Sequence, residues 1–320
     1  MNSALLPFRI WSRAHTWMTA APHAVAALGL LRSVIGICGL AFYLEDYGNR
    51  RLLHGPEGYY GHDLLSGYFE RSSGWSVYLL SDSLIWFEFL FHVGILVTIL
   101  IALGVGGRGA LGLHFVLLWS LFMTNPMLLD GGDNLMMIVV PFLLLTRCFD
   151  RFRIHRPIWT PGPAKWNLGT VAHNTGLLLI AGQVCIVYLM AGLYKVQGQL
   201  WQDGTAIYYI LRTPEFFWPG ITEIIFHFDW LIVLASYATV LTSIAFPVLV
   251  LFPAGRPIAV ALMAAFHLAI GILMGLTSFA LIMIAIDLLF VNQHVVRAAG
   301  EIRLAIARRL RFASTETALA

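Results

Sequence analysis

The residues best placed to do chemistry stand at the end of a long uncharged run. Lys195 follows residues 176–190, which carry no charge, and precedes the segment QGQLWQDGTA with Trp201. A charge at the edge of the hydrocarbon layer is costly and tends to be either paired or functional. The alternative is that Lys195 only extends its ammonium group toward the headgroups beside an aromatic belt.

The polar segment after Lys195 predicts a hairpin at the membrane surface. It contains the turn dipeptide Asp203-Gly204 and is followed by IYYIL, which is apolar but too short to span. A polar turn bounded by apolar segments is typical of re-entrant or interfacial structure that lines a cavity. Trp201 is suited to the interface, so we expect it to shape this hairpin together with Asp203 and Gly204.

A second group of polar side chains lies in the turn NPMLLDGGDN at residues 125–134. Its glycines allow special backbone dihedrals, and Asp130, Asp133 and Asn134 offer hydrogen-bond acceptors. Asp133 is therefore a candidate catalytic group and Asn134 a candidate binding group. The alternative is that Asp133 only caps the apolar helix that follows, as aspartate commonly does.

Five further polar residues fall inside apolar segments, where each needs an explanation. Glu88 and His92 are four apart and therefore share one helix face, and His267 lies near the middle of a later segment. Arg32 and Asp287 lie toward the opposite surface, and we expect them to form a buried ion pair. Lone histidines in a bundle commonly tie two helices together. The polar residues assigned to the outer half of the membrane are expected to surround a single cavity. They are Lys195, Glu88, His92, His267, Asp133 and Asn134.

The composition indicates which class of protein positions these groups. Of the 320 residues, 59% are hydrophobic and 12% charged, fewer charges than a soluble domain carries. A membrane-spanning helix needs about 20 apolar residues. Eight apolar segments cover residues 25–44, 84–105, 110–129, 135–149, 175–195, 230–252, 258–276 and 279–291. The sequence predicts an all-α, polytopic membrane helix bundle of about eight helices with one re-entrant or interfacial hairpin.

The distribution of positive charge predicts an orientation. With a cytoplasmic N-terminus, fourteen of the 20 lysines and arginines fall in inside segments and five in outside segments. This asymmetry is the one expected for a multi-pass protein of the cell membrane with both termini in the cytoplasm. We therefore predict an amphipathic cytoplasmic N-terminus at residues 1–24, a membrane domain at 25–292 and a basic cytoplasmic tail at 293–320. The tail is suited to lie on anionic lipid.

Other functional classes find little support. The net charge of +3 follows from this topology and does not indicate nucleic-acid binding. The N-terminus has no short apolar core followed by a cleavage site, so no cleavable signal is predicted. Cys38, Cys148 and Cys185 are isolated and lack metal-ligand spacing, so buried inert thiols are expected, with no metal and no thiol chemistry.

Taken together, several segments resemble the horizontally transferred transmembrane (HTTM) family, which includes the membrane part of vitamin K-dependent γ-glutamyl carboxylase. They are AGLYK, GQLWQDGTAIYY, LLDGGDNLMM and FHLAIGILMGLTSFALIMIAIDLLF. LLRSVIGICGL and LLHGPEGYY look similar too, so the resemblance covers roughly residues 25–292. The W-x-D-G-T-A-x-x-Y hairpin with its upstream lysine is the most specific element.

The resemblance implies a mechanism. In the carboxylase, a lysine after an Ala-Gly dipeptide deprotonates a vitamin K-type hydroquinone, and the matching position here is Lys195. Oxygen then converts the quinol anion to a stronger base that takes a proton from a substrate glutamate. With Lys195 as the base, the other polar residues of the outer half become candidates for the same site. We expect Lys195, Asp133 and His267 to be catalytic, and Trp201, Glu88, His92 and Asn134 to bind the quinone.

The chain departs from the carboxylase in two places. The turn before residue 135 offers Asp133 or Asn134 where the carboxylase has a histidine, and no counterpart of the large lumenal domain is apparent. Three hypotheses therefore stand. The first is an intramembrane quinone-linked or peptide-modifying enzyme with an outward-facing site. The second is a non-catalytic component of a peptide-toxin maturation, secretion or immunity system that binds a small secreted peptide. The third is a small-molecule transporter.

Overall fold

The computed structural model describes residues 6–72, 74–154, 163–302 and 304, and within these ranges every regular element is helical. The all-α prediction is confirmed. In chain order the α-helices are α1 (Leu6–Ala20), α2 (Val25–Glu45), α3 (Arg50–His54), α4 (His62–Ser72), α5 (Leu84–Leu103), α6 (Gly107–Phe122), α7 (Gly131–Leu143), α8 (Pro163–Val196), α9 (Gln199–Gln202), α10 (Ala206–Ile210), α11 (Ile221–Phe226), α12 (Asp229–Leu249), α13 (Gly255–Leu273) and α14 (Thr277–Asp287). Short 3-10 turns are η2 (Tyr47–Asn49), η3 (Val77–Leu80), η4 (Pro126–Leu128) and η5 (Leu288–Val291).

Six helical stretches in the described ranges are long and apolar enough to cross a membrane. They are α2, α5, residues 168–196 of α8, α12, α13 and the stretch Thr277–Ile302 that begins with α14. The remaining two predicted segments correspond to α6 and α7, which are shorter. The 13 residues of α7 extend only about 20 Å at 1.5 Å per residue, less than the ~30 Å hydrocarbon layer.

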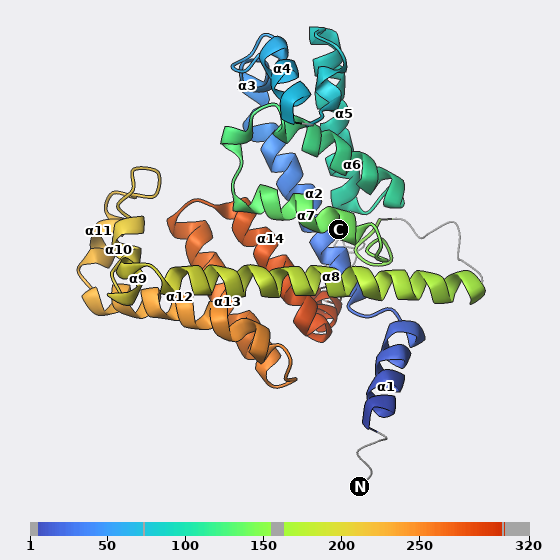
Figure 1. Ribbon diagram of the computed structural model, residues 1–320, viewed down its shortest axis with the longest axis vertical. Coiled ribbons are helices and arrows are strands. Elements are labelled where there is room, and N and C mark those ends of the chain that lie inside the picture. Colours follow the sequence, from blue (N-terminus) through green and yellow to red (C-terminus); the bar gives the residue numbers. More distant parts are fainter. Residues whose placement is uncertain (1–5, 73, 155–162, 303, 305–320) are drawn as a thin grey trace, which may run out of the picture.

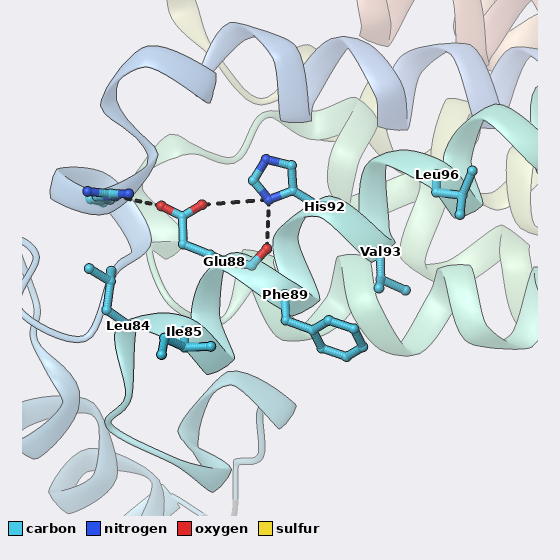
Figure 2. A pocket seen from close by; sticks show the side chains of 8 residues that line it. Leu84, Ile85, Glu88, Phe89, His92, Val93 and Leu96 are labelled. Carbon is cyan, nitrogen blue, oxygen red and sulfur yellow. Dashed lines mark hydrogen bonds and ion pairs between the residues drawn. The ribbon is translucent and has the colours of Figure 1, made fainter.

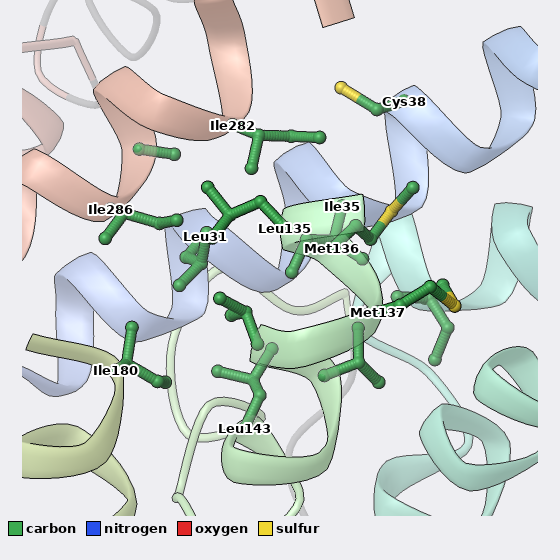
Figure 3. Close-up of a cluster of buried hydrophobic side chains, with 14 of the residues drawn as sticks. Leu31, Ile35, Cys38, Leu135, Met136, Met137, Leu143, Ile180, Ile282 and Ile286 are labelled. Atoms are coloured by element: carbon green, nitrogen blue, oxygen red, sulfur yellow. The ribbon is translucent and has the colours of Figure 1, made fainter. Parts of the chain in front are cut away.

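The helices form two groups that meet at α14 and α7. One group contains α2, α5 and α6, and the other contains α8, α12 and α13; α14 packs on both α2 and α13 (Figure 1). The short helix α7 contacts α14, α8, α6 and α2. Figure 3 shows the apolar core at this junction. Its residues include Leu31, Met136, Ile180, Ile282 and Ile286, all of which are fully buried.

Glycines permit close approach where the helices of this core cross. A Cβ on Gly36 would lie 2.4 Å from the backbone nitrogen of Ala102, so α2 and α5 meet backbone to backbone. A Cβ on Gly176 would lie 2.6 Å from the carbonyl oxygen of Phe142, which brings α8 equally close to α7. Small residues at helix crossings are a common means of packing membrane helices, because they increase van der Waals contact.

The segment between α2 and α5 folds into η2, α3, α4 and η3. Two hydrogen bonds fasten η3 to the bundle: the Ser76 hydroxyl donates to the carbonyl of Ser120 at 2.8 Å, and the Trp86 indole donates to the carbonyl of Val77 at 2.9 Å. The loop is thus an ordered cap over α5 and α6, and it places Arg50 and Arg51 of α3 beside the start of α5.

At the N-terminal end of the chain, α1 packs against α8. The side chain of Asn174 donates to the carbonyls of Trp17, Met18 and Ala21 at 3.0–3.2 Å. Trp17 and Met18 lie in the last turn of α1, and Ala21 is the residue that follows the helix. Asn174 thus satisfies carbonyls that a helix C-terminus leaves open. Most of the predicted basic tail, residues 303 and 305–320, and the loop segment 155–162 lie outside the described residues. The cytoplasmic orientation of both termini stays a prediction.

The predicted ion pair between Arg32 and Asp287 is wrong. The Arg32 guanidinium is fully buried and donates to backbone carbonyls. The acceptors are those of Cys148 (3.2 Å), Arg151 (3.3 Å), Ile101 and Phe152. Ile101 belongs to the last turn of α5, where carbonyls carry partial negative charge, and its carbonyl also accepts from the backbone N–H of Gly104 at 3.1 Å. Although α2 and α14 are neighbours, Arg32 faces α5 and the loop after α7, whereas Asp287 bonds to α8.

Candidate functional site

The centre of the bundle holds three polar side chains from three different helices. The Tyr188 hydroxyl of α8 lies 2.9 Å from Nε2 of His267 in α13 and 2.8 Å from Oδ2 of Asp287 in α14. All three residues are at most 3% exposed. We call Tyr188, His267 and Asp287 the central network.

Aromatic rings enclose the central network. Phe246 of α12 contacts the Tyr188 ring edge-on at 4.6 Å between centroids, and Phe279 of α14 contacts His267 at 5.4 Å. Hydrogen bonds in such a setting are strong because little solvent competes for them. Buried polar groups of this kind tie helices together or mark proton and substrate pathways.

A second polar group lies where α3 meets the start of α5. The Glu88 carboxylate accepts two hydrogen bonds from Arg50, at 2.9 and 3.1 Å, and one from Arg51 at 2.5 Å. The hydrogen bonds to Glu88 raise the pKa of Arg50 above its usual value. Two guanidinium groups on one carboxylate keep Glu88 ionised, since an opposite charge favours the charged form. His92 follows one turn later, with Nδ1 3.6 Å from the Glu88 carboxylate.

The hydrogen bonds of His92 determine which of its ring nitrogens is a base. Nδ1 lies 2.7 Å from the backbone carbonyl oxygen of Glu88, which can only accept, so Nδ1 carries the proton. In the neutral ring Nε2 is then an acceptor, and it lies 3.2 Å from the hydroxyl of Tyr47. The neutral ring of His92 therefore has Nε2 as its acceptor, near the surface and beside the Tyr47 hydroxyl.

A shallow, open hollow of about 610 Å³ lies along the exposed face of α5 beside this polar group. Its apolar lining is Leu84, Ile85, Phe89, Val93 and Leu96. Figure 2 shows Glu88 and His92 together, with apolar side chains in a row beside them on the same helix. We call this feature, with Arg51 at its rim, the α5 groove. An elongated molecule with a polar head and an apolar body matches its chemistry.

The acidic turn before α7 is a reciprocal helix cap. Oδ1 of Asp130 accepts from the backbone N–H groups of Gly132 (2.6 Å) and Asp133 (3.0 Å). In return the Asp133 side chain accepts from the backbone N–H of Asp130 at 3.0 Å. The predicted capping is confirmed in this form, with Asp130 as the N-cap and Asp133 as its partner. Asn134, which is exposed, also donates to the Asp130 carbonyl.

Lys195 lies in the last turn of α8, as expected, and its Nζ is 5.3 Å from the centroid of the Trp201 ring. This distance is within the range of a cation–π contact. Among the described residues no carboxylate forms an ion pair with it. The hairpin consists of α9 and α10, both packed on α12, and Gly204 between them has φ +72°. The predicted turn at Asp203-Gly204 is thereby confirmed.

The candidate residues do not form the single cavity that we expected. Glu88 and His92 lie at the α5 groove, Lys195 at the far end of α8, and His267 in the central network. Figure 1 places α9 and α10 on one side of the molecule and α5 on another. The reason is the two-group architecture, because α5 packs on α2 and α6 and not on α8 or α12.

The sequence of the chain matches the family model of the HTTM domain over residues 21–294. The chain belongs to the HTTM family. No solved structure matches it.

Two proteins of Bacillus subtilis (strain 168) are similar to this HTTM protein. One is the uncharacterized protein YitO, 25% identical over 272 residues, which cover 82% of this chain and 84% of YitO. The other is the sporulation-delaying protein SdpB, 25% identical over 210 residues, which cover 64% of each chain. The alignment with SdpB thus spans slightly less than two thirds of its length.

Several residues that the structure of this HTTM protein joins have no distinguishing signal in the sequence. Tyr188, the middle of the central network, has no polar neighbour in sequence that would distinguish it. Buried His54 lies 2.7 Å from the Thr124 hydroxyl and 2.9 Å from the Asp46 carboxylate, and so fastens α3 to the ends of α2 and α6. The adjacent pair Arg50-Arg51, by contrast, was a visible signal, since an ionised Glu88 at the membrane surface calls for basic partners.

Proposed function

We propose that this HTTM protein is an intramembrane enzyme that binds a lipid-soluble hydroquinone in the α5 groove, on the outward side. The observation that carries the proposal is the combination of an apolar groove with a base nitrogen at its head. Small-molecule sites are typically apolar clefts with a few well-placed polar groups. A hydroquinone bound there would supply an acidic hydroxyl and reducing equivalents.

The residues of the groove fit such a ligand. Leu84, Ile85 and Phe89 offer contacts for an isoprenoid-like body, and Val93 and Leu96 extend the apolar surface toward the bilayer centre. At the head, Nε2 of His92 can accept a hydroxyl proton while Nδ1–H stays on the Glu88 carbonyl. The Glu88 carboxylate, 3.6 Å from Nδ1, would then face a positively charged ring, and this attraction favours the proton transfer.

Lys195 has a separate place in this proposal. It stands at the end of α8, and α8 and its hairpin pack on α12, with the hairpin on a different side of the molecule from α5 (Figure 1). Lys195 therefore cannot act on a ligand in the α5 groove. The resemblance assigns it the role of base, and its lack of a described carboxylate partner is compatible with a neutral amine. We therefore propose Lys195 as the base of a second, substrate-facing site at the α9–α10 hairpin.

A photoreactive quinone analogue with the purified protein would test the binding site. We expect labelled peptides to come from α5, and His92→Phe to weaken binding about fivefold, the effect of losing one hydrogen bond of ~1 kcal/mol. Ile85→Trp should also weaken binding, because it fills the groove at an 81% exposed position. Ile37→Trp is the control, since Ile37 is 52% exposed on α2 and outside the groove. Labelling elsewhere, or equal weakening by the control, would refute the site.

The similarity to SdpB supports a second candidate function. A component of a peptide-toxin maturation, secretion or immunity system would bind a small amphipathic peptide, for which an apolar groove with a charged rim is equally suited. The two candidates differ in what displaces the photoreactive quinone. Displacement by a secreted peptide encoded beside this gene, and not by unlabelled quinone, would favour the peptide-binding function.

A further inference from the structure

The central network can hold its protons in two ways. A tyrosine hydroxyl has one hydrogen, so with two partners Tyr188 must donate to one and accept from the other. In one arrangement Tyr188 donates to ionised Asp287 and accepts from Nε2–H of His267. In the other, protonated Asp287 donates to Tyr188, which donates to Nε2 of His267. The observed distances of 2.8 and 2.9 Å serve both arrangements without movement of any heavy atom.

Switching between the two arrangements transfers one proton along the network. The Asp287 Oδ2–H bond breaks as a new Tyr188 O–H bond forms, and the old Tyr188 O–H bond breaks as His267 Nε2–H forms. If Nδ1 of His267 then releases its proton, the ring is neutral again. The end atoms, Oδ1 of Asp287 and Nδ1 of His267, are buried and lack a hydrogen-bond partner in the described part of the chain. Rotation of the Asp287 carboxyl group brings a proton bound at Oδ1 to the side that faces Tyr188, and Nδ1 of His267 releases a proton at the other end.

On the outer side, one aromatic ring separates the network from the acidic turn. The Phe279 ring contacts His267 at 5.4 Å, and the Phe279 backbone approaches Gly132, where a Cβ would lie 2.7 Å from the Phe279 Cα. Gly132 lies between Asp130 and Asp133, the carboxylates of the helix cap. The turn that carries Asp130 and Asp133 thus packs on Phe279, the residue whose ring contacts His267.

On the opposite side, two aromatic rings separate the network from a cavity of about 870 Å³. Phe246 contacts Tyr188 at 4.6 Å and Phe290 at 5.4 Å, and Phe290 lines the cavity. Cys185, one turn before Tyr188 in α8, also lines it, and its polar rim includes the exposed side chain of Arg256. The cavity lies between α8, the end of α12, the start of α13 and η5.

We propose that the central network is the middle of a proton path across the bundle, from the acidic turn before α7 to the cavity at the other face. The ion it carries is the proton, and the rings of Phe279 on one side and of Phe246 and Phe290 on the other close the path at rest. Chains of histidine, carboxyl and hydroxyl groups inside membrane helices are a common means of proton transfer. The proposal is independent of the hydroquinone site, since it uses no residue of the α5 groove.

Purified protein in liposomes with an internal pH-sensitive dye and an imposed potassium diffusion potential would test this path. We expect vesicles with the natural protein to change internal pH faster than empty vesicles. Tyr188→Phe should lower the rate to that of empty vesicles, because it removes the shared hydroxyl and keeps the ring. Tyr43→Phe is the matched control, a fully buried tyrosine outside the network, and should leave the rate unchanged. Phe279→Ala should raise the rate by opening the outer ring.

Three further results decide between a proton path and a static tie between helices. A rate for the natural protein equal to that of empty vesicles would overturn the proposal, as would an unchanged rate in Tyr188→Phe. If Tyr188→Phe is not recovered as folded protein, Asp287→Asn is measured in its place. Asparagine retains the shape and hydrogen bonding of Asp287 but cannot release a proton at neutral pH. An unchanged proton flux in Asp287→Asn would equally overturn the proposal.

Discussion

Replacing Arg32 by methionine should severely destabilise this protein. The guanidinium is 0% exposed and is the common donor to four backbone carbonyls, which lie at the end of α5 and in the loop after α7. Methionine has a similar length but cannot donate, so these carbonyls lose their charged partner. Leaving one buried polar group unsatisfied costs ~1–3 kcal/mol. Some of the carbonyls can relax toward other donors, so we expect a loss of ~3–5 kcal/mol in the free energy of unfolding.

The partners of Arg32 predict two further results. Arg32→Lys should recover only part of the loss, because a single ammonium group cannot reach carbonyls that the planar guanidinium contacts in several directions. Arg32→Met combined with Asp287→Leu should be as destabilising as the sum of the single changes, within ~0.5 kcal/mol, since the two side chains share no partner.

Reversible unfolding by SDS titration in mixed micelles would measure these free energies, with far-UV circular dichroism as the signal. If Arg32→Lys were as stable as the natural protein, the carbonyls would need only a charge and not the planar guanidinium. A double change more than ~1 kcal/mol less destabilising than the sum would contradict the separate partners, because such coupling would indicate a direct interaction between Arg32 and Asp287.

The remaining predictions concern the hairpin, the acidic turn and the topology. Lys195→Arg should abolish complementation of a deletion strain at normal protein yield, since a guanidinium cannot release its proton near neutral pH; full complementation would exclude Lys195 as a base. Gly204→Val should lower the yield of folded protein, because φ is +72° there, whereas Trp201→Phe should be tolerated; equal yields would mean that the hairpin is loosely held. Asp130→Ala should cost ~1 kcal/mol in the same SDS titration, through loss of the cap, and an unchanged midpoint would contradict that role. A cysteine at Gly131 should react with an impermeant thiol reagent added outside intact cells; reaction only after permeabilisation would reverse the orientation.

The hydrophobic pattern was sufficient to predict the fold class and the approximate positions of the helices. All eight predicted apolar segments overlap helices of the structure, although α6 and α7 are shorter than expected. Local turn chemistry was equally informative. The aspartates before α7 form the cap, and Gly204 has the positive φ that an Asp-Gly turn favours. Such features depend on residues a few positions apart, so one stretch of sequence contains all the information they need.

Only the tertiary structure determined which polar groups meet. The rotation and depth of each helix decide its contacts, and these depend on close packing at sites such as Gly36 and Gly176, far from the polar residues themselves. For that reason Arg32 and Asp287, which the sequence placed at similar depth, bond to different neighbours, and an inconspicuous Tyr188 joins His267 to Asp287. Apolar periodicity tells which face of a helix avoids water or lipid, but it does not tell which other helix lies against that face.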